Sequence, residues 1–303
     1  MQVNNASSNI APRNSLNIAL CLFVPVLMLT LLTIASRTPI IFTVLIGVVF
    51  SFIMLTNYAL MHEAAHGSLH EKPVLNHALG SFTAWHFPMS CRFLTITHLV
   101  HHRCNRTDHE MFDYYYEGDN RFIKFCQWYG ILLGFHYLIV PLGSVLVSLL
   151  PKAWIIRIAK DYRSSGVLFD DFTGKDINRI RLEVIGGILY WTILWQLLSF
   201  QWLPVLILYA MAGFQWSTRQ YLTHAFTPRD VMHGALILRA NPLMKLVLLN
   251  GNYDLVHHLH PRASWIHLER LAPQQVEPVS FWKQYFSMWK GPRPCTESAP
   301  SPL

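Results

Sequence analysis

Long apolar stretches alternate with short polar ones along this chain of 303 residues. Each apolar stretch is close to the roughly 20 residues that an α-helix needs to cross the hydrocarbon core of a bilayer, or slightly shorter. Windows without acidic or basic residues fall at about 17–36, 39–61, 127–150, 184–200 and 203–218. The pattern therefore predicts an all-α, polytopic membrane protein.

The charges between the windows set the expected topology. Basic residues gather in the stretch 151–183, and the positive-inside rule places such a stretch in the cytoplasm. If the polar segments that precede the third window also lie there, the window 127–150 begins and ends on one side of the membrane. Gly134 and Pro141 suit a bent interfacial or re-entrant helix at that place. Four crossing helices remain.

Short polar turns at 36–39 and 200–204 would join these crossings into two hairpins, with both chain ends in the cytoplasm. The Asn/Ser-rich residues 1–16 are expected to form a flexible tail, and the Pro/Ser-rich residues 291–303 a disordered one. Residues 17–290 are then a single membrane-embedded domain. Its polar, histidine-rich segments would form a cap on the cytosolic side.

Composition agrees with this class, because 52% of the residues are hydrophobic and only 14% are charged. The mean hydropathy is +0.28. A net charge of +7 raises the question of nucleic-acid binding, but the basic residues lie between the apolar windows and are interpreted as determinants of membrane orientation. Five separated cysteines without a C-x-x-C pair are expected to be free thiols.

Three histidine-rich motifs lie where the apolar windows end: HEAAH at 62–66, HLVHH at 98–102 and DLVHH at 254–258. Residues at i, i+3 and i+4 share one face of a helix and can converge on one ion. Seven histidines exceed the four ligands of a structural zinc site, so two ions are favoured over one. Imidazole binds iron, copper, nickel and zinc alike, so the spacing leaves the metal open.

These motifs resemble the three histidine boxes of the integral-membrane fatty acid desaturase family, H-x-x-x-H, H-x-x-H-H and H-x-x-H-H. The similarity continues in HEAAHGSLH at 62–70, HHRCNRTDHEMFDYY at 101–115 and NYDLVHHLHPRASW at 252–265, and covers roughly residues 40–270. It implies four membrane helices beneath a cytosolic cap, with two iron ions and O2 as co-substrate. The residues at the matching positions are the expected metal ligands: His62, His66, His98, His101, His102, His224, Asp254, His257 and His258.

Asp254 departs from the family pattern, because the leading position of the third box is usually a histidine. A carboxylate there could bind iron directly, orient a ligand imidazole, or be an ordinary polar residue, and the sequence leaves these roles open. The departure weakens the transfer of the ordinary desaturase reaction. His224, in Tyr221-Leu222-Thr223-His224, matches a further family histidine after the last apolar window.

Several polar neighbours of the boxes need a separate interpretation. His70 follows His66 by four residues and is a candidate extra ligand, whereas His260 points away from the third box if that segment is helical. Glu63 lies off the face of the first box, and we expect no catalytic role for it or for any residue beyond the metal ligands. Three carboxylates after the second box either hold ligand imidazoles or form a solvated turn: Asp108, Glu110 and Asp113.

The resemblance implies oxidation of an alkyl chain, most simply the introduction of a double bond into a fatty acid or fatty acyl lipid. Hydroxylation, carotenoid oxygenation or ketolation, and oxidative decarboxylation to a terminal alkene are open alternatives on the same scaffold. A different class is a non-catalytic membrane metal-binding protein such as a transporter, but transport favours ionisable residues within the spans, which the windows lack.

Electrons for such a reaction have to come from another protein. The chain has no dinucleotide-binding fingerprint and no cysteine quartet for an iron–sulfur cluster. A separate donor of ferredoxin, rubredoxin or cytochrome type is therefore implied. The basic stretch 151–183 is either a docking surface for an acidic donor or a determinant of topology.

Overall fold

The structure is a computed structural model that describes residues 10–159 and 171–303. The helices up to the last long one are α1 (Asn14–Ala35), α2 (Ile40–His66), α3 (Pro73–His86), α4 (Cys91–Cys104), α5 (Arg121–Leu132), α6 (Phe135–Leu149), α7 (Lys152–Ala159), α9 (Gly174–Leu198) and α10 (Trp202–Leu222). Short helices come after these: α11 (Pro242–Val247), α12 (Asp254–Leu259), α13 (Leu268–Leu271) and α14 (Phe281–Met288). Two 3-10 turns are η2 (Asp108–Glu110) and η3 (Trp265–His267).

Strands are a minor part of the fold. Two parallel pairs of two-residue strands link distant segments: β1 (Tyr114–Tyr115) with β4 (Arg293–Pro294), and β2 (Leu238–Arg239) with β3 (Val279–Ser280). The described residues are thus mostly helical, as the apolar pattern predicts.

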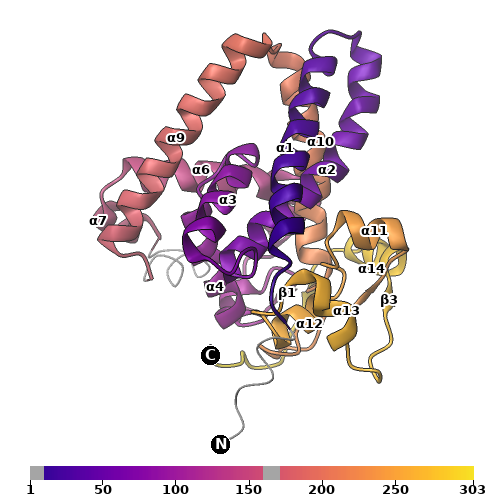
Figure 1. Cartoon of the computed structure of the whole chain (residues 1–303). Coiled ribbons are helices and arrows are strands. Elements are labelled where there is room, and N and C mark those ends of the chain that lie inside the picture. The colour runs from indigo at the N-terminus through magenta and orange to yellow at the C-terminus, as the bar shows by residue number, and fades with distance from the viewer. Residues whose placement is uncertain (1–9, 160–170) are drawn as a thin grey trace, which may run out of the picture.

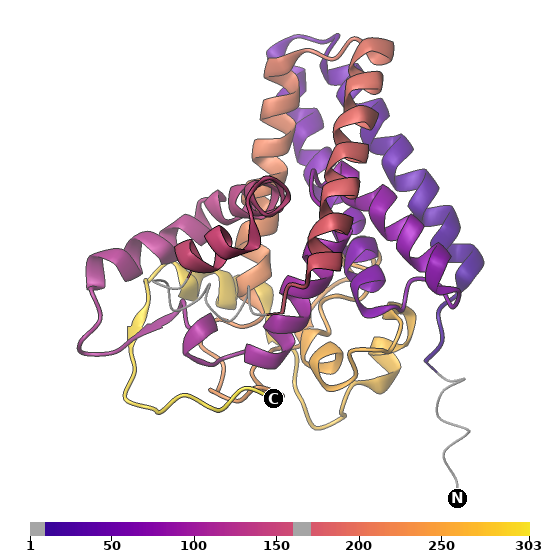
Figure 2. The same ribbon diagram turned by 90° about the vertical axis from the view of Figure 1, so that its left-hand side faces the viewer.

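Four long helices stand upright as two hairpins whose tips lie together (Figure 1). The first, α1–α2, turns where the sequence predicts, and the second, α9–α10, turns at Ser199–Gln201, slightly before the expected 200–204. The backbone N–H of Gln201 donates to Ser36 Oγ at 3.1 Å, which joins the two tips. The remaining helices lie lower and more nearly across the hairpins (Figure 2).

Two of the described helices, α1 and α2, are long and apolar enough to cross a membrane. The bent pair α5–α6 would be a third if it formed one span. Helices α9 and α10 are long enough but less apolar over that length, because α9 begins with charged residues and α10 ends with polar ones. The apolar helices fit a membrane protein, and four crossings stay a prediction.

The apolar window 127–150 is divided between α5 and α6, which meet at 90°. Gly134 lies at the bend with φ of +93°, a left-handed conformation that favours glycine. A Cβ atom there would come within 2.8 Å of the Phe214 Cα atom. The expected bent element is therefore present, and the close approach of α10 explains why its corner holds a glycine.

Helix α4, which carries the second histidine motif, is fixed at its start by α9. Ser90 caps α4 by accepting the Phe93 N–H. The Glu183 carboxylate of α9 accepts hydrogen bonds from Ser90 Oγ at 2.5 Å and from the Arg92 N–H at 2.9 Å. An acidic group at a helix N-terminus also complements the helix dipole. The second hairpin thus sets the position of the second motif.

Both chain ends contact the histidine-rich side of the protein. Of the expected flexible tail 1–16, residues 1–9 lie outside the described residues, while Ile10 O accepts the Ser264 N–H at 3.0 Å and α1 begins at Asn14. Within residues 291–303, which are expected to be disordered, Arg293–Pro294 form β4 and pair with β1. The Leu303 N–H also donates to Arg103 O at 3.0 Å. The amino-acid composition of these segments does not predict such backbone hydrogen bonds.

Candidate metal centre

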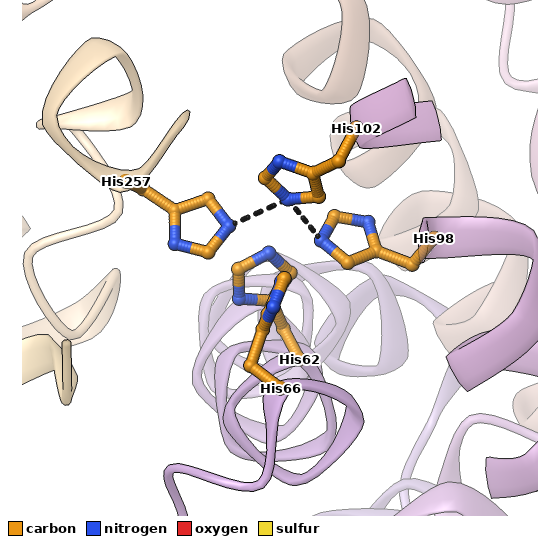
Figure 3. A group of neighbouring side chains, drawn as sticks. All are labelled: His62, His66, His98, His102 and His257. Atoms are coloured by element: carbon orange, nitrogen blue, oxygen red, sulfur yellow. Dashed lines mark hydrogen bonds between the residues drawn. The ribbon is translucent and has the colours of Figure 1, made fainter. Parts of the chain in front are cut away.

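Three helices bring the histidine motifs to one place (Figure 3). His62 and His66 lie one turn apart at the end of α2, which stops at Gly67 in a left-handed conformation with φ of 72°. The second motif occupies the last two turns of α4, and the third lies in the six-residue helix α12. Segments almost 200 residues apart in sequence therefore face one another, since His62 and His257 have ring centroids 4.4 Å apart.

Five imidazoles form the first group, in which one nitrogen from each ring lies within 4.8 Å of all the others: His62, His66, His98, His102 and His257. His102 Nε2 is 3.0 Å from both His98 Nε2 and His257 Nε2. Two nitrogens bound to one ion at about 2.1 Å and at right angles would be about 3.0 Å apart. The rings in Figure 3 turn toward this common centre.

A second group contains His101, His224 and His258, again with ligand nitrogens within 4.8 Å of one another. Neighbouring residues in the sequence are divided between the groups, since His102 belongs to the first and His101 to the second. The groups are adjacent, because the rings of His102 and His258 have centroids 4.3 Å apart. The described residues thus offer two neighbouring sites.

Two ligand candidates in the second group are oriented through their other ring nitrogen. His101 Nδ1 lies 2.6 Å from Glu110 Oε2, and His224 Nδ1 lies 3.0 Å from Gly234 O. A carbonyl oxygen only accepts, so the Nδ1 of His224 is the donor in this hydrogen bond and its Nε2 faces the second group. Burial favours neutral His101, but the Glu110 carboxylate outweighs it and raises the pKa of His101.

Asp254 lies beside this second group, with Oδ2 3.1 Å from His224 Nε2. Burial favours the protonated acid, but the electrostatic interactions and hydrogen bond with the neighbouring imidazoles, those of His224 first, outweigh it and hold the pKa of Asp254 well below its usual range. Because the Nδ1 of His224 donates its hydrogen bond to Gly234 O, the Asp254 carboxylate and the His224 Nε2 together could bind a cation. Direct ligation, orientation of an imidazole and an ordinary polar role all stay open for Asp254.

The donor set fits a metal such as iron. Burial lowers the pKa of His98, His102 and His257, so these imidazoles are neutral, which is the form that binds metals. His66 Nε2 is buried with no hydrogen-bond partner among the described residues. A buried polar atom without a partner costs free energy that a bound cation would recover. Nitrogen donors with one nearby carboxylate suit iron, although they suit zinc and copper as well.

The other polar residues near the boxes have partners of their own. Among the described residues, His70 belongs to neither group, and its Nδ1 accepts the Lys72 N–H at 2.9 Å. His260 is exposed at the end of α12 and also lies outside both groups. Glu63 accepts from Ser68 Oγ and from the Trp265 N–H, which ties α2 to the segment after the third motif. Its role in the fold is structural.

Of the three carboxylates after the second box, Glu110 contacts a ligand candidate, His101. Asp113 is fully buried in an ion pair with Arg106 at 2.8 Å, and also accepts from Tyr221 Oη. Asp108 forms an ion pair with Arg229 at 2.7 Å. These two carboxylates stabilise the loop after α4, and the Gly234 carbonyl takes the orienting role that the sequence does not reveal.

Comparison with known proteins gives one family. The model of the family described as fatty acid desaturase matches residues 36–291. No curated protein matches the chain. Both histidine groups, Glu110 and Asp254 lie within the matched region.

Proposed function

The chain belongs to the fatty acid desaturase family, and on that premise we propose that it is a membrane-bound, non-haem di-iron oxidoreductase that uses O2 to introduce a double bond into a fatty acid or fatty acyl lipid. The observation that carries the proposal is the pair of adjacent histidine groups inside the matched region. One ion alone would leave at least three converging imidazoles without a role.

Each histidine group would hold one iron. The first would use His62, His66, His98, His102 and His257, and the second His101, His224 and His258 with Asp254. When bound, iron would supply the activation of O2 that removes hydrogen from an unactivated C–H bond. The protein would fix the ligands: Glu110 and the Gly234 carbonyl hold the imidazoles of His101 and His224, and such partners also raise ligand basicity.

The overall reaction needs electrons from outside the chain. The alkyl chain gives up two hydrogen atoms, a donor gives two electrons, and with two protons O2 becomes two molecules of water. We propose a separate ferredoxin, rubredoxin or cytochrome-type protein as donor. A docking role for the basic stretch 151–183 stays a prediction, and residues 160–170 of it lie outside the described residues.

The same scaffold is proposed to cross the membrane four times, through α1, α2, α9 and α10, with the metal centre and both chain ends on the cytoplasmic side. The joined hairpin tips support this topology, as do large exposed aliphatic side chains along α9, including Leu189 and Leu197. Charge on α9 is confined to its first turns, near the histidine-rich side. Residues 17–290 would form one domain.

Asp254 keeps other outcomes open on the same site. A carboxylate in place of a histidine would increase the negative charge around the second ion, so the ordinary desaturase reaction does not transfer directly. Hydroxylation replaces the second abstraction by transfer of oxygen to the carbon, and decarboxylation removes the head carbon. Only the product separates these outcomes from desaturation.

The direct test is to express the chain and a His101→Ala variant in a host without related activity. His233→Ala is the matched control, because His233 is 65% exposed and lies outside both groups. We expect iron and an unsaturated lipid product with the unaltered chain and with the control. His101→Ala should lose the product and about half of the iron, because only the second group is altered. Identical products from all three would refute catalysis by this centre, and a hydroxylated or shortened product would refute desaturation.

A further inference from the structure

Two short helices of the C-terminal part turn large apolar side chains away from the protein. On α11, Leu243 and Leu246 are 67% and 59% exposed. On α14, Trp282 and Phe286 are 63% and 61% exposed and lie four residues apart, on one face of the helix. Neither helix is part of an apolar window. Their exposed faces therefore need a partner that the spanning helices do not provide.

The height of α11 along the first hairpin is set by a hydrogen bond to α2. Thr56 Oγ1 donates to Val247 O, the last residue of α11, at 2.8 Å. Helix α2 begins at Ile40 at the hairpin tip, so at 1.5 Å per residue Thr56 lies about 24 Å along it. The hydrocarbon core of a bilayer is about 30 Å thick. Helix α11 thus contacts α2 close to where α2 leaves the hydrocarbon core.

Helix α14 is placed at a similar height by α10. Gln284 Nε2 donates to Leu222 O at 3.2 Å and to Ala225 O at 2.6 Å. Leu222 ends α10, which begins at Trp202, and therefore lies about 30 Å from the other hairpin tip. In Figure 1, α11 and α14 accordingly lie beside the lower ends of the upright helices.

The polar residues of α14 match the same setting. Lys283 on α14 and Lys290, two residues after its end, are exposed and lie close in sequence to Trp282 and Phe286. Helices that lie in a membrane surface place aromatic and aliphatic side chains at the boundary with the acyl chains, and lysines among the headgroups. Tryptophan is also enriched at that depth. Lipid is therefore the occupant that the charge, the composition and the position of α11 and α14 along the hairpins all favour.

We propose that α11 and α14 are interfacial anchors that insert Leu243, Leu246, Trp282 and Phe286 into the bilayer surface on the histidine side. The third histidine motif lies between the two helices in the chain. The anchors therefore hold its segment against the membrane, beside the end of α2 that carries the first motif. This inference rests on the proposed membrane topology and does not depend on the proposed reaction.

The test measures the depth of single nitroxide labels in the whole chain, reconstituted in vesicles of phosphatidylcholine and phosphatidylglycerol. The two cysteines that are not buried, Cys126 and Cys295, are first changed to serine. Labels are then placed in Leu246→Cys and Phe286→Cys. Leu45→Cys, 60% exposed on α2, is the reference in lipid, and Ser298→Cys, exposed in the C-terminal segment, is the reference in water.

Collision with O2, which concentrates in lipid, is compared with collision with a water-soluble nickel chelate. We expect the labels at 246 and 286 to favour O2, as at 45, and the label at 298 to favour nickel. A preference for nickel at 246 and 286 would refute the anchors. Protection from both reagents would mean that protein covers the faces, such as a second copy or an electron donor, and would refute them as well. Neither readout involves iron or activity, so failure here is separate from failure of the proposed function.

Discussion

His101 Nδ1 and Glu110 Oε2 lie 2.6 Å apart, and this contact fixes which nitrogen of His101 faces the second histidine group. Glu110 belongs to η2, the single 3-10 turn just after α4. Burial favours the protonated carboxyl, but His101 outweighs it and lowers the pKa of Glu110. The carboxylate is thus charged and able to accept the imidazole N–H.

Glu110→Gln should weaken metal binding by the second group. The amide keeps a hydrogen-bond acceptor but loses the charge that makes His101 a stronger ligand, and loss of such a partner reduces metal affinity by roughly 10–100-fold. Competition with a chelator measures this affinity. Glu117→Gln is the matched control, since it makes the same change on an exposed loop residue. Equal affinities for the two variants would contradict the orienting role of Glu110.

Substitutions of Asp254 should show whether its carboxylate takes part in metal binding. We expect Asp254→Ala to lower bound iron from about two ions per chain toward about one, because the second group loses the carboxylate that lies 3.1 Å from His224 Nε2. Asp254→His, which restores the usual family residue, should keep more iron than Asp254→Ala. Elemental analysis of the purified protein measures both. Full iron content in Asp254→Ala would remove Asp254 from the metal site.

The buried ion pair between Arg106 and Asp113 should be important for stability. Their side chains are 1% and 0% exposed, so Asp113→Asn leaves a buried guanidinium without its charged partner. Breaking such a pair costs roughly 3–5 kcal/mol. The surface pair of Lys245 and Glu269 is the comparison, since Glu269→Gln should cost at most about 1 kcal/mol. Thermal unfolding in detergent compares the two variants. Equal losses of stability would contradict the greater contribution of the buried pair.

The bend between α5 and α6 should depend on Gly134. Alanine at this position must adopt a positive φ, which costs about 1–2 kcal/mol, and its Cβ would collide with the Phe214 backbone. We therefore expect Gly134→Ala to lower the unfolding temperature clearly. Gly130→Ala is the control within α5, because a Cβ there meets no atom within 4 Å. That variant should be neutral or stabilised by up to about 1 kcal/mol.

The sequence predicts much of this architecture, because the long helices and the histidine motifs depend on local patterns of residues. Length and hydropathy alone predict the two apolar windows that form α1 and α2. The bend at Gly134 was expected from a glycine within an apolar stretch and from the charges that flank it. The convergence of His98 and His102 was expected from their i, i+4 spacing on one helix, which holds wherever that helix lies.

The features that the sequence does not reveal depend on contacts between distant segments. The Gly234 carbonyl that orients His224 is a backbone group, and every residue has one. The separation of His101 from His102 depends on how α4 faces α12, which no local spacing specifies. Two-residue strands such as β1 and β4 have no detectable period, so the order in residues 291–303 could not be predicted from a Pro/Ser-rich composition.

The central claim is that two ions lie side by side in the two histidine groups. X-ray absorption at the iron edge of the purified chain, together with its iron content, tests this most directly. We predict about two irons per chain, each surrounded mainly by imidazole nitrogen, with His66→Ala and His258→Ala each removing about one ion. A chain that holds at most one iron, or iron without imidazole scattering, would contradict the paired centre.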